Sequence, residues 1–408
     1  MRAAAPRTAA LLAIALAAAA APPAIAEGYE VSGAPVAGAA TIAEAPAIEP
    51  GLVQDSLPPP GEDGARRIYR IEVPDGARLH ATALAVPLGA VAASEDYPRL
   101  DLSTRIVDSA GTSCEADVED DVGDATTGRG TLRAWASTGV LGQEDTCAGG
   151  ALFLVVTREG ALHGDEEIPL ELRTVIEPAG DGDASPAPRA HAVSDAGPEG
   201  SAPAQDVVTA GGASYADAAP LAPGSYRLVL APDDTRYIAI DAAEGQRLRW
   251  RAEIVSIGHD DSSRQLVISP SNPARMRVPL AEDSEESVSA TARTVLGAGY
   301  AAPISLRNRE SEDPAVAGVW MPGRQVLALT QQTYPEHEDD GSPIAPTGDI
   351  EVVLTLEVEG EPVSSPEGRG IGESLRALPW TRLGLGGAAA LAGLTGLVLI
   401  GLAVLRRR

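Results

Sequence analysis

Two cysteines are the residues of this sequence whose type and spacing most directly imply chemistry. Cys114 and Cys147 are its only cysteines, and 33 positions separate them. In an exported chain an even number of cysteines favours a disulfide, whereas a metal site would need further Cys or His ligands at suitable spacing. The sequence therefore predicts a Cys114–Cys147 disulfide. In the loop-entropy description it adds about 3–4 kcal/mol and closes an acidic, glycine-rich insertion.

The motifs of well-known catalytic sites are missing. The sequence contains no GxSxG, HExxH, P-loop or protein-kinase motif set. Its histidines stand singly, and we expect surface or turn positions for all five: His80, His163, His191, His259 and His337. A Ser/His/Asp site assembled from distant positions stays open, although no sequence feature indicates one. The sequence thus predicts no enzyme activity, no catalytic residue and no cofactor site.

Two acidic clusters offer oxygen ligands of the kind that calcium prefers. One comprises Glu115, Asp117, Glu119, Asp120, Asp121 and Asp124, and the other Glu336, Glu338, Asp339 and Asp340. Neither follows the D-x-[DN]-x-[DN]-G spacing of a calcium loop. Solvated acidic loops are the competing interpretation in so acidic a protein, so the sequence predicts no metal site.

The charge of the chain excludes one class of partner. Its 31 basic residues, all arginine, face 58 acidic residues, which gives a formal charge of −27. Nucleic-acid affinity comes mainly from cations that neutralise phosphates, so nucleic acid is not an expected partner.

The two ends of the chain read as targeting and anchoring segments. Arg2 and Arg7 precede an apolar run at 9–21, and Ala24-Ile25-Ala26 has the small-x-small pattern of a signal-peptidase site. The uncharged stretch 383–405 is 23 residues long, enough for a helix that crosses a bilayer. Three arginines, 406–408, follow it and favour a cytoplasmic end. We expect a single-pass type I protein in the cell membrane, with its large N-terminal region outside the cell.

The region between these ends contains an internal repeat. Pairing Gly76 with Gly245 aligns IYRIEVPDGARL with YIAIDAAEGQRL. Ile48-x-Pro50-Gly51 matches Leu221-x-Pro223-Gly224, and GDEEIPLEL at 164 matches GDIEVVLTL at 348, where Leu170 pairs with Leu354. Matching starts and ends in the same order indicate a duplicated domain.

Each copy has the alternation of β-strands. Leu248, Trp250, Ala252 and Ile254 alternate with charged residues, a period of two that gives one apolar and one polar face. Two such sheets packed by their apolar faces form a β-sandwich. We expect Trp250 to be buried between the sheets, with Ile240 and Leu354 as neighbours. The alternative is an exposed ligand platform between Arg249 and Arg251.

The predicted fold is all-β: two tandem antiparallel β-sandwiches between a signal peptide and a C-terminal transmembrane helix. The predicted segments are a signal peptide at 1–26, a flexible N-terminus at 27–44, a first sandwich at 45–178, a disordered linker at 179–210, a second sandwich at 211–360, a linker at 361–382, a transmembrane helix at 383–405 and a cytoplasmic tail at 406–408.

Short motifs of the second copy carry a resemblance to known families. Pro223-Gly224-Ser225-Tyr226, Tyr237 and Gly245-Gln246-Arg247-Leu248 resemble β-sandwich modules of the pre-peptidase C-terminal type. The stretches 211–226 and 302–309 are similar to a non-catalytic region of actinobacterial membrane-anchored surface proteins, some of which carry a von Willebrand factor A domain. The resemblance implies a β-sandwich fold. No DxSxS motif is present, so the adhesive role of that domain is not implied here.

Three hypotheses for function follow. The first is a non-enzymatic surface module of the bacterial cell envelope that binds a protein or glycan partner. The second is an accessory subunit of an envelope peptidase or secretion system, or a hydrolase without a recognisable motif. The third is a sensor that signals through the membrane span, which would need a partner helix because only three residues follow the span.

Overall fold

In the computed structural model the described residues run from Tyr29 to Val363, with gaps at 62–64, 88–98, 125–130, 144–146, 179–197, 199–210, 258–262, 282–283, 285, 292, 335, 338–342 and 345–347. The predicted signal peptide, inter-domain linker, transmembrane helix and cytoplasmic tail lie outside the described residues, as does nearly all of the linker at 361–382. Within the described part of the chain, no helix is both long and apolar enough to cross a membrane.

The first half of the chain forms two facing sheets. One sheet has the strand order β1-β2-β10-β4-β8-β6 and the other β3-β9-β5-β7. The bounds are β1 Ala34–Pro35, β2 Gly51–Leu57, β3 Ala65–Val73, β4 Arg78–Ala85, β5 Arg99–Val107, β6 Glu115–Glu119, β7 Asp121–Asp124, β8 Leu132–Thr138, β9 Gly150–Glu159 and β10 Ile168–Glu177. We call this pair of sheets the first sandwich.

The second half repeats the arrangement. Its sheets have the orders β12-β21-β14-β17 and β11-β13-β18-β15-β16. The bounds are β11 Ala219–Pro220, β12 Gly224–Leu230, β13 Thr235–Ala242, β14 Arg247–Ile257, β15 Ser263–Ser271, β16 Ser287–Ser289, β17 Val295–Gly299, β18 Gly323–Tyr334 and β21 Ile350–Glu359. This half also contains one 3-10 helix, η2 Leu306–Glu310, and one short α-helix, α1 Pro314–Ala317. A small hairpin is formed by β19 Glu336–His337 and β20 Pro343–Ile344. We call this half the second sandwich.

The two sandwiches share one topology. The central strands β2-β10-β4-β8 correspond to β12-β21-β14-β17, and β3-β9-β5 correspond to β13-β18-β15. Even isolated bridges recur: Ala39 pairs with Ile68 as Gly212 pairs with Tyr237. The turn glycines that anchor the sequence alignment, Gly76 and Gly245, both have a left-handed backbone, with φ of 79° and 83°. These correspondences support the duplication.

The residues predicted from the alternation to face inward form the core of the second sandwich. Trp250 is fully buried in the core of the second sandwich, which also contains Ile240 and Leu354. The ring of Tyr300 packs edge-on against its indole at 6.2 Å between ring centres. The prediction of a buried Trp250 is therefore confirmed, and the exposed-platform alternative is wrong.

The start of the described chain differs from the sequence-based expectation of a flexible segment at 27–44. From Tyr29 onward this segment carries β1 and the 3-10 turn η1 (Ile42–Glu44). β1 pairs with β2 of one sheet, and Ala39 bridges to Ile68 of the opposite sheet. The backbone of Gly38 also donates to Asp55 at 2.7 Å. Hydrogen bonds to both sheets compensate for the lack of large apolar side chains, which composition alone does not reveal.

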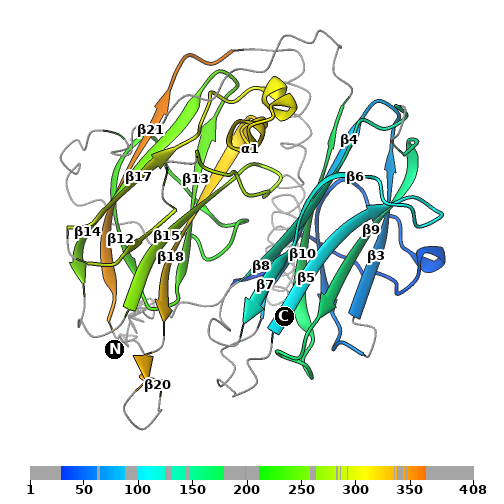
Figure 1. Ribbon diagram of the computed structural model, residues 1–408, viewed down its shortest axis with the longest axis horizontal. Helices are drawn as coiled ribbons and strands as arrows, with labels where there is room; N and C mark the ends of the chain where they lie inside the picture. Colours follow the sequence, from blue (N-terminus) through cyan, green and yellow to red (C-terminus); the bar gives the residue numbers. More distant parts are fainter. Residues whose placement is uncertain are drawn as a thin grey trace, which may run out of the picture.

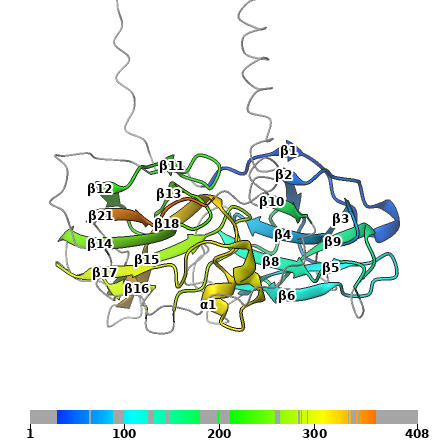
Figure 2. The ribbon, with the colours of Figure 1, turned by 90° about the horizontal axis from the view of Figure 1, so that it is seen from above.

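The four sheets stack as successive layers, with the two sandwiches side by side (Figures 1 and 2). The sheet containing β10, β4 and β8 faces the sheet containing β13, β18 and β15 across the boundary between the sandwiches. These two sheets are not equivalent members of the repeat, so the contact joins unlike faces. Strand β4 is buried along nearly its whole length because one of its faces meets the core and the other meets the second sandwich.

Candidate functional site at the joint between the sandwiches

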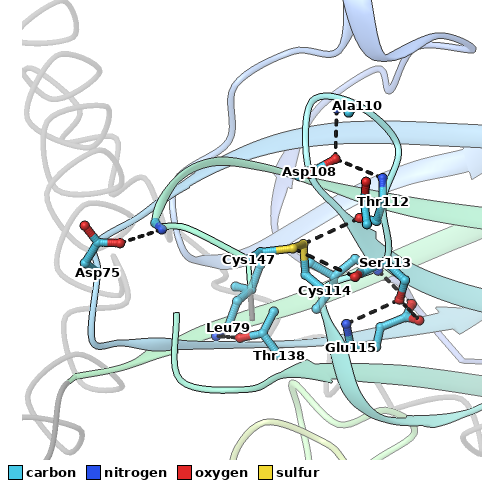
Figure 3. The surroundings of a disulfide bond; sticks show 12 residues. Asp75, Leu79, Asp108, Ala110, Thr112, Ser113, Cys114, Glu115, Thr138 and Cys147 are labelled. Carbon is cyan, nitrogen blue, oxygen red and sulfur yellow. Dashed lines mark hydrogen bonds between the residues drawn. A yellow bond between two sulfur atoms is a disulfide. The ribbon is translucent and has the colours of Figure 1, made fainter. Parts of the chain in front are cut away.

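The predicted disulfide is present. Cys114 and Cys147 are bonded, and they lie where the loop after β5 meets the segment before β9 (Figure 3). Cys114 belongs to the first core, and the carboxylate of Asp75 accepts the backbone N–H of Gly149 at 2.6 Å beside the bridge. The disulfide therefore ties the insertion to the core, as the sequence analysis expects of a structural bridge.

The most elaborate polar site lies between the two sandwiches, and we call it the joint. One of its parts is a loop of the second sandwich, residues 271–277, which we call the docking loop. Asn272 shapes this loop: its Oδ1 accepts the backbone N–H groups of Ala274 and Met276 at 2.9 and 3.2 Å. The loop crosses the outer face of the first sandwich, where Thr82 on β4 donates to the carbonyl oxygen of Ala274 at 2.8 Å.

An ion pair between Arg275 and Glu171 lies at the centre of the joint. Arg275 extends from the docking loop to the carboxylate of Glu171 on β10. The side chain of Glu171 is fully buried and that of Arg275 is 9% exposed, so water screens this pair little. Arg275 has a φ of 65°, a left-handed conformation that costs a non-glycine residue roughly 1–2 kcal/mol. Tertiary contacts therefore hold its backbone in an unfavourable state.

The N-terminal segment reaches the same carboxylate. The hydroxyl of Tyr29 donates to Oε1 of Glu171 at 2.5 Å, and the backbone N–H of Ser32 donates to Oε2. Burial raises the pKa of Tyr29 well above its ordinary value, so the phenol stays protonated and able to donate. One carboxylate thus binds the N-terminal segment and the second sandwich at once.

Aromatic rings surround this point. Tyr29 packs against Tyr215 and Tyr237 of the second sandwich, with ring centres 6.4 and 5.7 Å apart. The guanidinium of Arg275 lies 5.2 Å from the ring centre of Tyr215. Tyr215 belongs to the stretch GGASYADAAP, in which the Asp217 carboxylate accepts the backbone N–H of Ser214 at 2.6 Å. The motif that resembles a family signature therefore positions a tyrosine at the joint.

A second polar group lies further along β10. Nε2 of His80 is 3.0 Å from Glu177, and Nδ1 of His80 is 2.7 Å from the hydroxyl of Ser137. Arg309 of the second sandwich also pairs with Glu177. With a neutral imidazole, Nε2–H donates to the carboxylate and Nδ1 accepts from the serine.

The second sandwich covers this group. The ring of Trp320 packs on His80 at 4.6 Å between ring centres, and Met276 lies 3.9 Å from the Ser137 hydroxyl. The expectation that His80 is a surface or turn residue is wrong, because the second sandwich buries the outer face of its strand. The sequence also gives no sign that Ser137, His80 and Glu177, on three neighbouring strands, form one chain of hydrogen bonds.

Three acidic residues of the first cluster, Glu115, Glu119 and Asp120, bind other parts of the protein. Glu115 accepts the backbone N–H of Ile106 at 2.9 Å, and Asp120 forms a two-pronged pair with Arg105. Glu119 accepts the indole N–H of Trp135. Within the described residues, no group of three His, Cys, Asp or Glu side chains is arranged to hold a metal ion. The side chains of the second cluster lie outside the described residues, as do His191, His259 and the side chain of His337.

Comparison with known proteins gives no family. No protein-family model and no curated protein matches the chain. Among solved structures, it is similar to the tandem CBM22-1–CBM22-2 domains of Paenibacillus barcinonensis Xyn10C, at 9% identity and a TM-score of 0.19, over 76% of this chain and 86% of that one. It is also similar to the CUB1-EGF-CUB2 region of human MASP-1/3, at 9% identity and a TM-score of 0.16, over 75% and 99% of the two chains. Such low TM-scores support no argument about function.

Proposed function

We propose that this chain is a non-catalytic, extracytoplasmic binding or structural module of the bacterial cell envelope, anchored by its C-terminal segment. The observation that carries the proposal is the buried Arg275–Glu171 pair, reinforced by Tyr29 and Ser32. Separating the sandwiches would break this pair, the Thr82–Ala274 hydrogen bond and the ring contacts of Tyr29, so the joint holds the two sandwiches in one orientation. The two outermost sheets therefore keep a fixed orientation relative to each other, which is suitable for a rigid surface module.

The outer face of the sheet containing β14 and β21 is the better candidate for partner binding. Four arginines project from it in a chain of charge −27: Arg227, Arg247, Arg249 and Arg251. Glutamates of β14 and β21 interleave with them, as in the Arg251–Glu253 pair at 3.6 Å and the Arg249–Glu359 pair at 2.5 Å. A face of alternating charges offers many donors and acceptors to a polar partner, either a glycan or a protein.

A matched pair of charge reversals tests this proposal. Arg251 and Arg70 each pair with a glutamate two residues further along an outer strand, but they lie on opposite outer sheets. The immobilised full-length protein is exposed to envelope protein and glycan fractions, and the retained component is identified. Wild type and Arg70→Glu should retain it, while Arg251→Glu should lose it. Retention of nothing at any salt or calcium concentration would overturn the proposal.

The anchored topology has its own test. Cleavage of the signal peptide should leave Glu27 as the first residue of the mature protein, and protease added to intact cells should digest residues 27–375. Protection of that region in intact cells, with digestion only after lysis, would reverse the orientation.

A hydrolase is the second candidate, and the Ser137–His80–Glu177 chain is the observation that favours it. Serine, imidazole and carboxylate in one hydrogen-bonded chain are the components of an acyl-transfer site. Against it, Ser137 is only 7% exposed, and Met276 and Trp320 cover the chain where a substrate would have to lie. A fluorophosphonate probe separates the candidates: labelling of wild type that disappears in Ser137→Ala supports the hydrolase, and no labelling supports the non-catalytic module.

A further inference from the structure

Arg173 is a buried cation to which no described residue offers a hydrogen-bond acceptor. It lies on the face of β10 that carries Glu171 and Glu177, the face that the second sandwich covers. The residue is 6% exposed. Among the residues that the structure describes, no oxygen accepts a hydrogen bond from its guanidinium and no carboxylate lies within ion-pair distance. The carboxylate of Glu171, its nearest acidic neighbour on the strand, is occupied by Arg275, Tyr29 and Ser32.

Among the described residues, only the nearby carboxylate of Glu171 compensates the positive charge of Arg173. Thr82 and Leu52 occupy the neighbouring positions on β4 and β2. The hydroxyl of Thr82 donates its hydrogen bond to the carbonyl oxygen of Ala274. Burial lowers the pKa of Arg173 to about 10; the like charge of Arg275 adds to this effect, and the carboxylate of Glu171 opposes it. Even so, the guanidinium carries its charge at neutral pH. Buried charges in proteins are normally paired, because an unpaired ion loses its hydration without compensation.

We propose that Arg173 binds a small oxyanion at the joint, of the phosphate, sulfate or carboxylate class. A guanidinium presents paired N–H donors that match two oxygens of such an ion. The bound ion supplies the hydrogen-bond acceptors that the described residues do not offer to this guanidinium, and it lies beside the Arg275–Glu171 pair. The inference does not depend on the identity of the envelope partner, because the site lies on the joint and not on the outer face.

Thermal unfolding of the full-length protein tests the proposal. Phosphate, sulfate and acetate are titrated separately against chloride at constant ionic strength. We expect the melting temperature of wild type to rise and saturate, by roughly 5 °C at about a hundredfold excess over the Kd, for at least one of the three ions. The anion that raises the melting temperature identifies the ligand class: phosphate or sulfate indicates a phosphoryl or sulfuryl group, and acetate indicates a carboxylate. Absence of a saturating rise with all three would overturn the proposal.

Three variants separate specific binding from the general stabilisation that excluded salts give every protein. Arg173→Met should abolish the saturating rise in melting temperature and leave only the linear salt effect. Arg173→Lys should give a smaller saturating rise, because lysine keeps the charge but lacks the paired N–H donors of the guanidinium. Arg66→Met removes an exposed arginine of the opposite outer sheet and should respond as wild type does. Without added oxyanion, Arg173→Met should melt close to wild type, because it breaks no hydrogen bond to a described residue and keeps most of the apolar length of the side chain. A saturating response that persists in Arg173→Met would contradict the assignment.

Discussion

Gly111 and Arg275 occupy the same position of the same loop in the two copies. Asp108 accepts two backbone N–H groups of its loop, from Ala110 and Thr112, as Asn272 does in the docking loop. An antiparallel β-bridge closes each loop: Val107 pairs with Ser113 in the first copy, and Ser271 pairs with Arg277 in the second. The shared left-handed position has φ of 83° at Gly111 and 65° at Arg275. The second copy thus has an arginine where glycine is favoured, and its side chain joins the sandwiches.

Replacing Arg275 by glycine should weaken the joint despite relieving the backbone. Arg275→Gly leaves Glu171 buried without its ion partner, at about 3–5 kcal/mol, and recovers roughly 1–2 kcal/mol of backbone strain. We expect chemical denaturation to show a net loss of about 1–4 kcal/mol in the free energy of unfolding. Arg293 is the matched control, because it is exposed and has a φ of 70°. Arg293→Gly should stay within about 1 kcal/mol of wild type, and an equal loss in both variants would refute a special role for Arg275.

The hydroxyl of Tyr29 should contribute to stability although Tyr29 is the first residue that the structure describes. Tyr29→Phe removes a hydrogen bond to the buried carboxylate of Glu171 and leaves the ring packing in place. Hydrogen bonds to charged groups contribute about 1.5–3 kcal/mol, so we expect a loss of that size in urea unfolding. Tyr226→Phe removes an exposed bond to the carbonyl of Ala222 and should cost less than about 1 kcal/mol. Indistinguishable losses would show that Tyr29 does not hold the joint.

The repeat was predictable from the sequence because its turns and core positions are local features. Gly76 and Gly245 mark equivalent turns, and the alternation of Trp250 with its neighbours gives the correct inner face. The sequence alignment of the last strands, which pairs Leu170 with Leu354, is wrong by two residues. Ala83 and Ala252 are equivalent positions of the repeat, and they pair with Leu172 and Leu354, so Leu172 corresponds to Leu354. A shift of two residues keeps every side chain on the same face, so periodicity cannot detect it.

The joint was not predictable in the same way. Glu171 and Arg275 are 104 residues apart, and each lies in a stretch that reads as a polar outer face or a turn. Alternation tells which face of a strand is polar but not whether another domain covers it. One signal was available: aligning DSAGT at Asp108 with NPARM at Asn272 places an arginine opposite a glycine. A non-glycine residue at a left-handed position is a pointer to function.

The disulfide should stabilise the first sandwich measurably. Peptide mapping without reductant should yield the linked Cys114 and Cys147 peptides. The double variant Cys114→Ala/Cys147→Ala should lose about 3–4 kcal/mol in the loop-entropy description. Reductant supplies the internal control, because it should lower the melting temperature of wild type toward that of the variant and leave the variant unchanged. Free thiols at Cys114 and Cys147 in protein isolated from its native host without reductant would disprove the bridge.

Acid should weaken the turn that holds Tyr215. Burial alone would raise the pKa of Asp217, but the Ser214 hydroxyl and the N–H groups of Ala213 and Ser214 donate to its carboxylate and lower the pKa overall. A carboxyl with a lowered folded-state pKa stabilises above its unfolded value of about 3.9, and this stabilisation is lost as pH falls through the folded value. The stability advantage of wild type over Asp217→Asn should therefore shrink as pH falls from about 6 to below 3. An advantage that is independent of pH would contradict this account.

Trp250 gives the most direct test of the second core. It pairs with Leu356 and Ala298 on neighbouring strands and is fully enclosed. Trp250→Ala should cost about 3–5 kcal/mol, a large part of the roughly 5–15 kcal/mol that stabilises a typical domain. The chain has four tryptophans, so the emission of Trp250 is best isolated as the difference between wild type and Trp250→Phe. That difference spectrum should be blue-shifted and resistant to iodide, because the ring contacts only protein. A red-shifted, readily quenched difference would mean that the ring faces solvent, and the arginines beside it would then belong to a binding surface on both sides of the strand.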